Sequence, residues 1–209
     1  KDPMIVLEDA DIDVASSAAV WGAFMNAGQT CLSVERCYVQ EKIYPKFLEK
    51  CVEKTNKLRV GSSSRVSSAG EGAYGPNPEV DLGPMIHERQ LRIVEQQVEE
   101  AKAHGAHIRT GGKRLSDIGP SFYAPTVVTD VSHDMRLMRE ETFGPVLPIM
   151  SFKTDEEAVG LANDSDLGLA ASIWTRDRGR GDALARRINS GTVQINDAVS
   201  CFGISEAPH

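Results

Sequence analysis

A regular alternation of helical and strand patterns near the end of this chain constrains its fold more than any other feature. Residues 155–163 and 177–189 carry the spacing of helices, whereas 170–174 and 191–195 have the composition of short strands. Only brief turns separate these segments. This order is typical of α/β proteins, in which helices cover a sheet of mainly parallel strands. The sequence therefore predicts an α/β fold with an open, largely parallel sheet flanked by helices.

The beginning of the chain extends this pattern. Residues 4–7 form an apolar run that predicts a buried strand, and residues 36–40 predict a second strand with β-branched and aromatic content. Residues 44–60 predict a helix after it. Strands and helices are therefore expected to alternate at both ends of the chain.

The helix between those first two strands has clear boundaries. Asp11 or Asp13 can cap its start, and it ends at residues 26–28, where Gly28 suits the left-handed position. Apolar and small residues recur at helical spacing and predict one buried face. The residues of that predicted face are Val14, Ala15, Ala18, Trp21, Gly22 and Met25.

The middle of the chain is less regular. Residues 61–84 are rich in Ser, Gly and Pro and predict a long loop or insertion. A helix follows over 87–104, and Gly105 stops it. Its predicted buried stripe is Leu91, Val94, Val98 and Ala101. Further strands are predicted at 106–109, 123–131 and 146–152, the last of them at a sheet edge because Pro148 interrupts it.

The charge balance excludes some classes of partner. The chain has 23 Lys and Arg against 30 Asp and Glu, a formal net charge of −7. Nucleic-acid and membrane-surface proteins need clustered basic charge, so neither partner is expected. No apolar run reaches the length of a membrane span.

The four cysteines point to a reducing compartment. Cys31, Cys37, Cys51 and Cys201 form no C-x-x-C pair, and four cysteines in a chain of this length are not a disulfide framework. The expected location is therefore cytoplasmic. The chain starts at Lys1-Asp2-Pro3 without an initiator Met or signal peptide. We expect residues 1–209 to form a single domain that is cut from a longer protein at both ends.

Cys31 is the first candidate for chemistry. It follows the glycine-bounded end of a helix, where a thiol can lie exposed in a cleft and act as a nucleophile. The alternative is a buried structural cysteine, because free cysteine is among the most buried residue types. The helix presents its negative end, which disfavours a thiolate, so activation requires a base or cation from elsewhere. The five histidines show no ligand spacing, and no metal site is expected.

Several motifs, in one order along the chain, resemble those of the aldehyde dehydrogenase superfamily. Residues 24–31, Phe-Met-Asn-Ala-Gly-Gln-Thr-Cys, resemble its nucleophile signature F-x-N-x-G-Q-x-C, and residues 140–146 resemble E-E-x-F-G-P-V. Residues 1–11 are similar to G-G-K-x-P-x-I-V-x-x-D-A-D. Residues 81–86 match D-x-G-P-x-I, and residues 190–196 match S-G-x-V-x-I/V-N.

The resemblance implies an NAD- or NADP-dependent oxidation of an aldehyde to a carboxylic acid. Cys31 would attack the carbonyl to form a thiohemiacetal, whose oxyanion the family holds partly with the cysteine's own backbone N–H. Hydride transfer would leave a thioester for water to hydrolyse. Glu141 corresponds to the family position that holds the nicotinamide ribose, and Phe143 to the one that packs against the nicotinamide.

The remaining positions are carried over less directly. Phe202 and Cys201 correspond to the stretch that lines the family's substrate tunnel. Asn196 would order the wall of the site or stabilise a turn. Glu140 is expected to be structural or to support its neighbour rather than bind the cofactor.

The resemblance also implies parts outside these residues. The family's general base lies directly before the position of Lys1, and its dinucleotide-binding domain and exchanging tail lie elsewhere. The expectation is a catalytic-domain portion of a homo-oligomeric enzyme that is inactive in isolation. Three alternatives remain open: a CoA-acylating dehydrogenase of the same superfamily, a thiol hydrolase, and a non-catalytic structural or oligomerisation module.

Overall fold

The apolar runs pair into a seven-stranded sheet in the computed structural model, which describes residues 1–62 and 79–200. The strand order is β3-β4-β5-β2-β1-β6-β7, and every neighbouring pair is parallel except β3 and β4. The strands are β1 (Pro3–Val6), β2 (Arg36–Gln40), β3 (His107–Thr110), β4 (Thr126–Thr129), β5 (Val146–Phe152), β6 (Ala170–Trp174) and β7 (Thr192–Ile195). The predicted α/β fold with a largely parallel sheet is confirmed.

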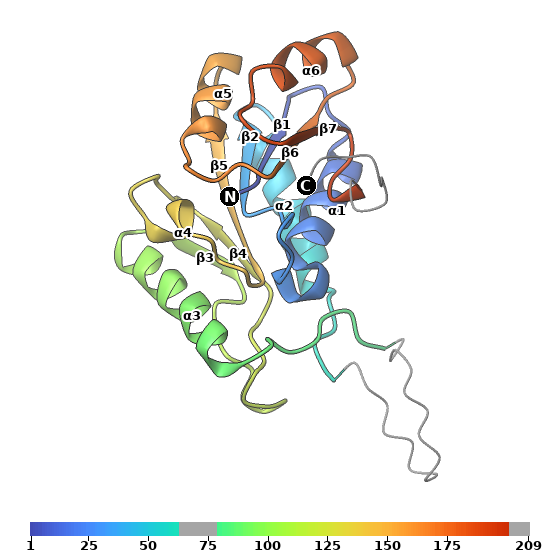
Figure 1. The fold of residues 1–209 in the computed structure, drawn as a ribbon. Coiled ribbons are helices and arrows are strands. Elements are labelled where there is room, and N and C mark those ends of the chain that lie inside the picture. Colours follow the sequence, from blue (N-terminus) through green and yellow to red (C-terminus); the bar gives the residue numbers. More distant parts are fainter. Residues whose placement is uncertain (63–78, 201–209) are drawn as a thin grey trace.

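Helices cover both faces of this sheet (Figure 1). They are α1 (Ile12–Phe24), the 3-10 turn η1 (Met25–Gly28), α2 (Tyr44–Asn56), α3 (Glu88–Ala103), α4 (Arg136–Arg139), α5 (Asp155–Asn163) and α6 (Arg178–Ala185). Met4 and Val6 of β1 pack with α1 and α2, whereas Ile5 packs with α3, α5 and α6. Because successive strand residues point to opposite faces, a strand between two helical layers must be apolar throughout. That requirement explains the continuous run Met-Ile-Val-Leu.

Several predicted boundaries hold. β2, β5, α5 and β6 have the predicted bounds, and α3 lies between its capping residues His87 and His104. The predicted stripe of α3 is buried. Other elements are shorter than predicted: α2 ends at Asn56 and not at residue 60, α6 ends at Ala185, and β4 spans four residues. The short helix α4 was not predicted.

β5 is an inner strand, so its predicted edge position is wrong. It lies between β4 and β2. Its pairing with β4 ends at Pro148, and its pairing with β2 begins at Ile149. The proline, which has no N–H to donate, therefore stands where the strand changes partners.

The predicted buried face of α1 is also wrong in part. Ala15 and Gly22 are buried as expected, but Val14 is 54% exposed and Trp21 is 52% exposed. Ser16, Ala19, Val20, Ala23 and Phe24 are buried instead. Small residues of α1 itself occur on every side of the helix, so its sequence periodicity indicates no single buried face.

The described ends of the predicted loop 61–84 are held together. Val60 and Leu82 form an isolated bridge, and the Gly61 N–H donates to the Leu82 carbonyl at 3.0 Å. The Asp81 carboxylate accepts hydrogen bonds from the Arg59 guanidinium at 3.0 and 3.1 Å. Residues 63–78 lie outside the described part of the chain. Within that part, no helix is both long and apolar enough to cross a membrane.

Candidate active site

The sheet topology gathers three segments that carry motifs at the amino ends of neighbouring strands. Residue 31 precedes β2, residues 140–145 precede β5, and Lys1 precedes β1, and these three strands are parallel neighbours. The amino ends of parallel neighbours lie at the same edge of a sheet. The segments before them therefore meet, although Lys1 and Pro145 are 144 positions apart in sequence.

Cys31 lies on the turn between η1 and β2 and is exposed. The turn is closed by the Ser33 N–H, which donates to the Thr30 carbonyl at 3.0 Å. The Ser33 hydroxyl and the Val34 N–H both donate to the Gly22 carbonyl, at 3.0 and 3.1 Å. These bonds tie the turn to the end of α1. The prediction that Cys31 is exposed after a tight helix exit is confirmed.

Three successive residues in the left-handed region make that exit. The φ angles of Asn26, Ala27 and Gly28 are 53°, 56° and 70°. The Asn26 side-chain amide donates to the Gln29 carbonyl at 3.0 Å, which supports this reversal of the chain. Asn and Gly adopt positive φ at low cost, whereas Ala27 is a strained position that the sequence did not reveal.

The backbone N–H of Cys31 is available as a donor. No hydrogen bond joins it to any residue in the described ranges 1–62 and 79–200. A free N–H beside an exposed thiol is the arrangement that can stabilise negative charge on an oxygen bound at the carbon under attack.

Gly28 brings the motif at residues 24–31 into backbone contact with the motif at residues 140–146. A Cβ atom built on Gly28 would lie 2.1 Å from the Gly144 carbonyl oxygen and 2.9 Å from the Pro145 nitrogen. Gly28 is three residues before Cys31, and Gly144 directly follows Phe143. Position 28 thus requires glycine for two reasons: the backbone of residue 144 approaches it closely, and its φ is positive.

Gln29 joins the third motif to this pair. Its side-chain oxygen accepts the Ile86 N–H at 2.8 Å, and its side-chain nitrogen donates to the Asn26 carbonyl at 3.2 Å and to the Pro84 carbonyl at 3.4 Å. One glutamine therefore links the helix exit to residues 81–86. The sequence analysis named Gln29 within a motif but did not assign it this contact.

The two predicted cofactor positions lie together before β5. Glu141 is exposed, and Phe143 is half-buried with a φ of 47°. Phe143 lines a pocket of about 400 Å³ with Asn26, Gln29, Pro84, Met85 and Ile86. An exposed carboxylate thus stands two residues before an aromatic ring that lines a pocket.

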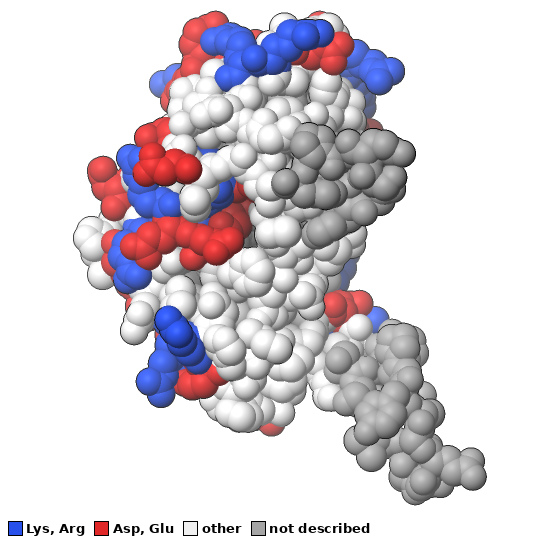
Figure 2. Space-filling model, viewed as in Figure 1, with Lys and Arg blue, Asp and Glu red and all other residues white. Residues whose placement is uncertain are grey.

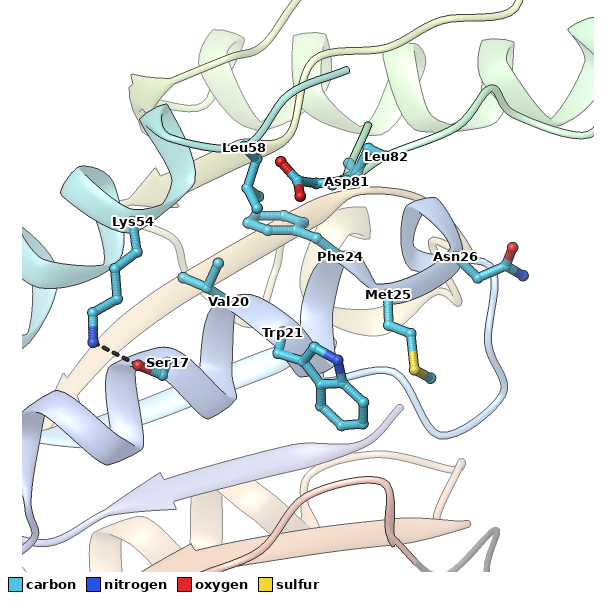
Figure 3. A pocket seen from close by; sticks show the side chains of 10 residues that line it. All are labelled: Ser17, Val20, Trp21, Phe24, Met25, Asn26, Lys54, Leu58, Asp81 and Leu82. Atoms are coloured by element: carbon cyan, nitrogen blue, oxygen red, sulfur yellow. Dashed lines mark hydrogen bonds between the residues drawn. The ribbon is translucent and has the colours of Figure 1, made fainter. Parts of the chain in front are cut away.

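A second pocket, of about 460 Å³, is also lined by Asn26 (Figure 3). Figure 3 shows Trp21, Met25 and Phe24 of α1 and η1 beside it, with Lys54 of α2 donating to the Ser17 hydroxyl at 2.7 Å. Its other lining residues are Val20, Leu58, Asp81 and Leu82. Trp21, predicted to lie on the buried face of its helix, is exposed and lines this pocket, whereas Met25 is half-buried against the core and lines the pocket as well.

Two predicted site residues cannot be placed. Cys201 and Phe202 lie outside the described residues. Asn196 is described, and its side chain holds the end of β7 to the end of β6: its oxygen accepts the Thr175 N–H at 2.9 Å, and its nitrogen donates to the Thr175 carbonyl at 2.8 Å. This geometry favours the turn-stabilising alternative for Asn196.

Charge is unevenly distributed over the viewed face (Figure 2). Side chains of both signs gather over α6 at the top and over α4 at the left, and uncharged residues form the middle of the face. Within the described residues, no group of three or more His, Cys, Asp or Glu side chains is placed to hold a metal ion.

We expect thiol reagents to distinguish Cys31 from the other described cysteines. Burial raises the pKa of Cys51, and it raises the pKa of Cys37 well above its usual value. Iodoacetamide should modify Cys31 at least ~100-fold faster than Cys37 or Cys51, because the thiolate is the reacting form. Peptide mass mapping over time measures these rates, and unfolding in urea should bring them together. Equal rates in the folded protein would contradict the exposure of Cys31.

Comparisons with known proteins identify the family of this chain. The model of the aldehyde dehydrogenase family matches residues 1–208. The chain is 44% identical over 208 residues to 4,4'-diapolycopene aldehyde oxidase of Methylomonas sp, covering 100% of this chain and 36% of that protein. It is 38% identical over 209 residues to a putative NADP(+) succinate-semialdehyde dehydrogenase of Mycolicibacterium smegmatis, covering 100% and 38%.

Solved structures show the same similarity. Betaine aldehyde dehydrogenase from Staphylococcus aureus in complex with NAD+ superposes with a TM-score of 0.85 at 34% identity, covering 94% of this chain and 37% of that one. The chain thus spans little more than a third of the length of these relatives.

Proposed function

Because this chain belongs to the aldehyde dehydrogenase family, we propose that the protein oxidises an aldehyde to a carboxylic acid with a nicotinamide cofactor and with Cys31 as the nucleophile. The observation that carries this proposal is the packing of Gly28 on Gly144. That contact places the turn with the exposed thiol beside the segment with Glu141 and Phe143.

The chemistry assigned to Cys31 has two stages. Its thiolate attacks the aldehyde carbon, so that an S–C bond forms and the carbonyl electron pair moves to oxygen, where the Cys31 N–H can donate to it. The bound nicotinamide supplies the hydride acceptor. After the carbon is oxidised, a thioester remains on Cys31. Attack by water then breaks the S–C bond and releases the carboxylic acid, and one proton of the water is lost to solvent as the thiolate returns.

Glu141 and Phe143 are assigned to the cofactor. A carboxylate accepts hydrogen bonds from both hydroxyls of a ribose, and a half-buried ring offers a flat apolar surface to the nicotinamide. One relative is named for NADP(+) and one solved neighbour holds NAD+. We keep both cofactors in the proposal, and we keep the homo-oligomer and the cytoplasmic location as predictions.

The test uses the protein as its gene encodes it. Formation of NADH or NADPH is followed at 340 nm with a panel of aliphatic and aromatic aldehydes, with and without CoA. Turnover without CoA supports the hydrolytic reaction, and an absolute need for CoA assigns the acylating one. A folded protein that binds a nicotinamide cofactor but oxidises no aldehyde would contradict the proposal and favour a structural module.

Substituting Glu141 should weaken cofactor binding selectively. Glu141→Gln loses a charge-assisted acceptor for the ribose, so we expect the KM for the cofactor to rise about tenfold or more with a smaller change in kcat. The neighbouring Glu140 provides a matched control, since it pairs with Arg136 at 2.8 Å on the surface. Glu140→Gln should leave the KM unchanged. Equal effects of the two variants would argue against the assignment of Glu141.

A further inference from the structure

A buried carboxylate connects the Cys31 turn to the segment before β5. Glu35 lies four residues after Cys31 and is 6% exposed. One of its oxygens, Oε1, accepts the backbone N–H groups of both Thr142 and Phe143, each at 2.8 Å. The other oxygen, Oε2, accepts a hydrogen bond from the Lys1 ammonium at 3.1 Å. Neither Glu35 nor Lys1 was singled out by the sequence analysis.

Lys1 and Gln97 complete this anchor around Thr142. The Lys1 side chain is fully buried, and its Nζ also donates to the Thr142 hydroxyl at 3.0 Å. That hydroxyl donates to the Gln97 side-chain oxygen at 2.8 Å, and the Gln97 nitrogen donates to the Glu141 carbonyl at 3.2 Å. Gln97 is itself fully buried on α3. The backbone of residues 141–143 is therefore bonded by Glu35, which directly precedes β2, and by Gln97 of α3, while Lys1 holds the Thr142 side chain.

A contribution to folding stability does not by itself explain the buried ion pair of Lys1 and Glu35. Desolvating two charges costs free energy that their attraction seldom fully returns, and apolar replacements of such pairs are often neutral or stabilising. Burial lowers the pKa of Lys1 below its usual value, and the Glu35 carboxylate opposes that shift. A costly ion pair that holds two successive backbone N–H groups is better explained by the conformation that it imposes.

That conformation is unusual. Phe143 has a φ of 47°, a left-handed conformation that is strained for an aromatic residue and persists only where the surrounding structure compensates for the strain. Two successive N–H groups that converge on one anion form a nest, and the anion in this nest is Glu35. The Glu35 carboxylate thus compensates for the strain of the backbone conformation in which Phe143 lines a pocket with Gln29 and Pro84.

We propose that Glu35 is a positioning residue for the cofactor: its charge-balanced carboxylate holds the backbone of Thr142 and Phe143 and so presents Glu141 and Phe143 in the orientation that binds the nicotinamide ribose and ring. This inference rests on the proposed function for the roles of Glu141 and Phe143. The hydrogen bonds that Glu35 accepts from Thr142 and Phe143 are observed independently of the proposed function. Glu35 acts through these two residues and takes no part in bond making.

The first test is Glu35→Gln in the protein as its gene encodes it. The amide still has an oxygen for the two N–H groups, but it turns an NH₂ group toward the Lys1 ammonium. We expect the dissociation constants and KM values of the cofactor to rise about tenfold, with kcat within a factor of about three. Glu95→Gln is the control, because Glu95 makes a comparable contact with Arg114 at 2.7 Å on the outer side of α3. It should leave the cofactor constants unchanged.

A second readout works without the cofactor. Amide hydrogen exchange of a peptide covering residues 141–144 should speed up about tenfold in Glu35→Gln and stay unchanged in Glu95→Gln. Faster exchange together with weaker cofactor binding supports the inference. A lower melting temperature with unchanged exchange and unchanged cofactor constants would show a purely structural role and overturn it.

The two proposals fail in different ways. If the wild-type protein binds neither NAD+ nor NADP+, the proposed function fails and the cofactor role of Glu35 fails with it, whatever the exchange shows. If the wild type turns over aldehydes but Glu35→Gln matches it in every constant, only the inference fails.

A further pair of variants applies if Glu35→Gln does not fold. Lys1→Met combined with Glu35→Gln, and Lys1→Met combined with Glu35→Met, are both neutral and similar in volume. They differ in whether position 35 offers an acceptor to the two N–H groups. We expect the methionine pair to bind the cofactor about tenfold more weakly and to exchange faster at residues 141–144. Equal behaviour would overturn the inference.

Discussion

Alanine in place of Cys31 is expected to abolish aldehyde oxidation, lowering kcat by ~10⁴-fold or more. Without the thiol no thiohemiacetal forms. The hydride would then have to leave the free aldehyde, which lacks the negatively charged oxygen that expels it. Serine at position 31 should be nearly as inactive, because a hydroxyl is a poor nucleophile without an adjacent base. Assays of NADH formation with the best substrate of the panel measure both effects.

The substitution should not disturb folding, and this makes the activity loss interpretable. Cys31 is exposed and its turn is held by Ser33 and Val34, so the Cys31→Ala protein should melt within a degree or two of the wild type. Cys37→Ala is the control: Cys37 is fully buried on β2, so its loss should lower stability and leave kcat almost intact. Activity above a hundredth of the wild-type value in Cys31→Ala would contradict the nucleophile assignment.

The layer architecture could be predicted from local patterns, because most elements have a recognisable pattern within a few residues; the short helix α4 does not. Continuous apolar runs marked the strands, and the stripe on α3 marked its buried side. Prediction failed where the decisive contact is distant. Pro148 suggested an edge, but the change of partner from β4 to β2 allows it inside the sheet.

The site was predictable in its parts but not in its connections. Motif resemblance pointed to Cys31, Glu141 and Phe143, and the structure has an exposed thiol, an exposed carboxylate and a pocket-lining ring at these positions. Their roles in catalysis and cofactor binding stay a prediction. Glu35 was missed because its partners are 107 and 108 positions away. One local signal existed: Gln97 lies on the apolar side of α3, and a polar residue in such a stripe must find a buried partner.

The contact between Gly28 and Gly144 is the one on which the geometry of the site depends most, and alanine at position 28 should destabilise the protein by about 3 kcal/mol or more. A Cβ atom there meets the Gly144 carbonyl oxygen at 2.1 Å, and the residue has a φ of 70°. The atoms that would have to move are backbone and not a flexible side chain. Urea unfolding followed by circular dichroism measures the change.

Alanine at two other glycines distinguishes the backbone strain of Gly28→Ala from its steric clash. Gly160 in α5 has open space around its Cβ position and no positive φ, so alanine should stabilise the protein by about 0.5–1 kcal/mol through helix propensity. Gly105 also has open space but a φ of 96°, so alanine there should cost only the backbone strain, about 1 kcal/mol. Gly28→Ala carries the strain and the clash together.

The activity of Gly28→Ala should fall further than its stability requires. The clash is relieved by moving the turn before Cys31 away from the segment after Phe143, and a displacement of about an ångström in such a site can cost a hundredfold in rate. Assays well below the melting temperature therefore should show a loss of kcat/KM that Gly105→Ala does not share. If the two variants lose the same activity at the same stability, the contact supports folding only, and the meeting of the two motifs does not set the geometry of the reaction.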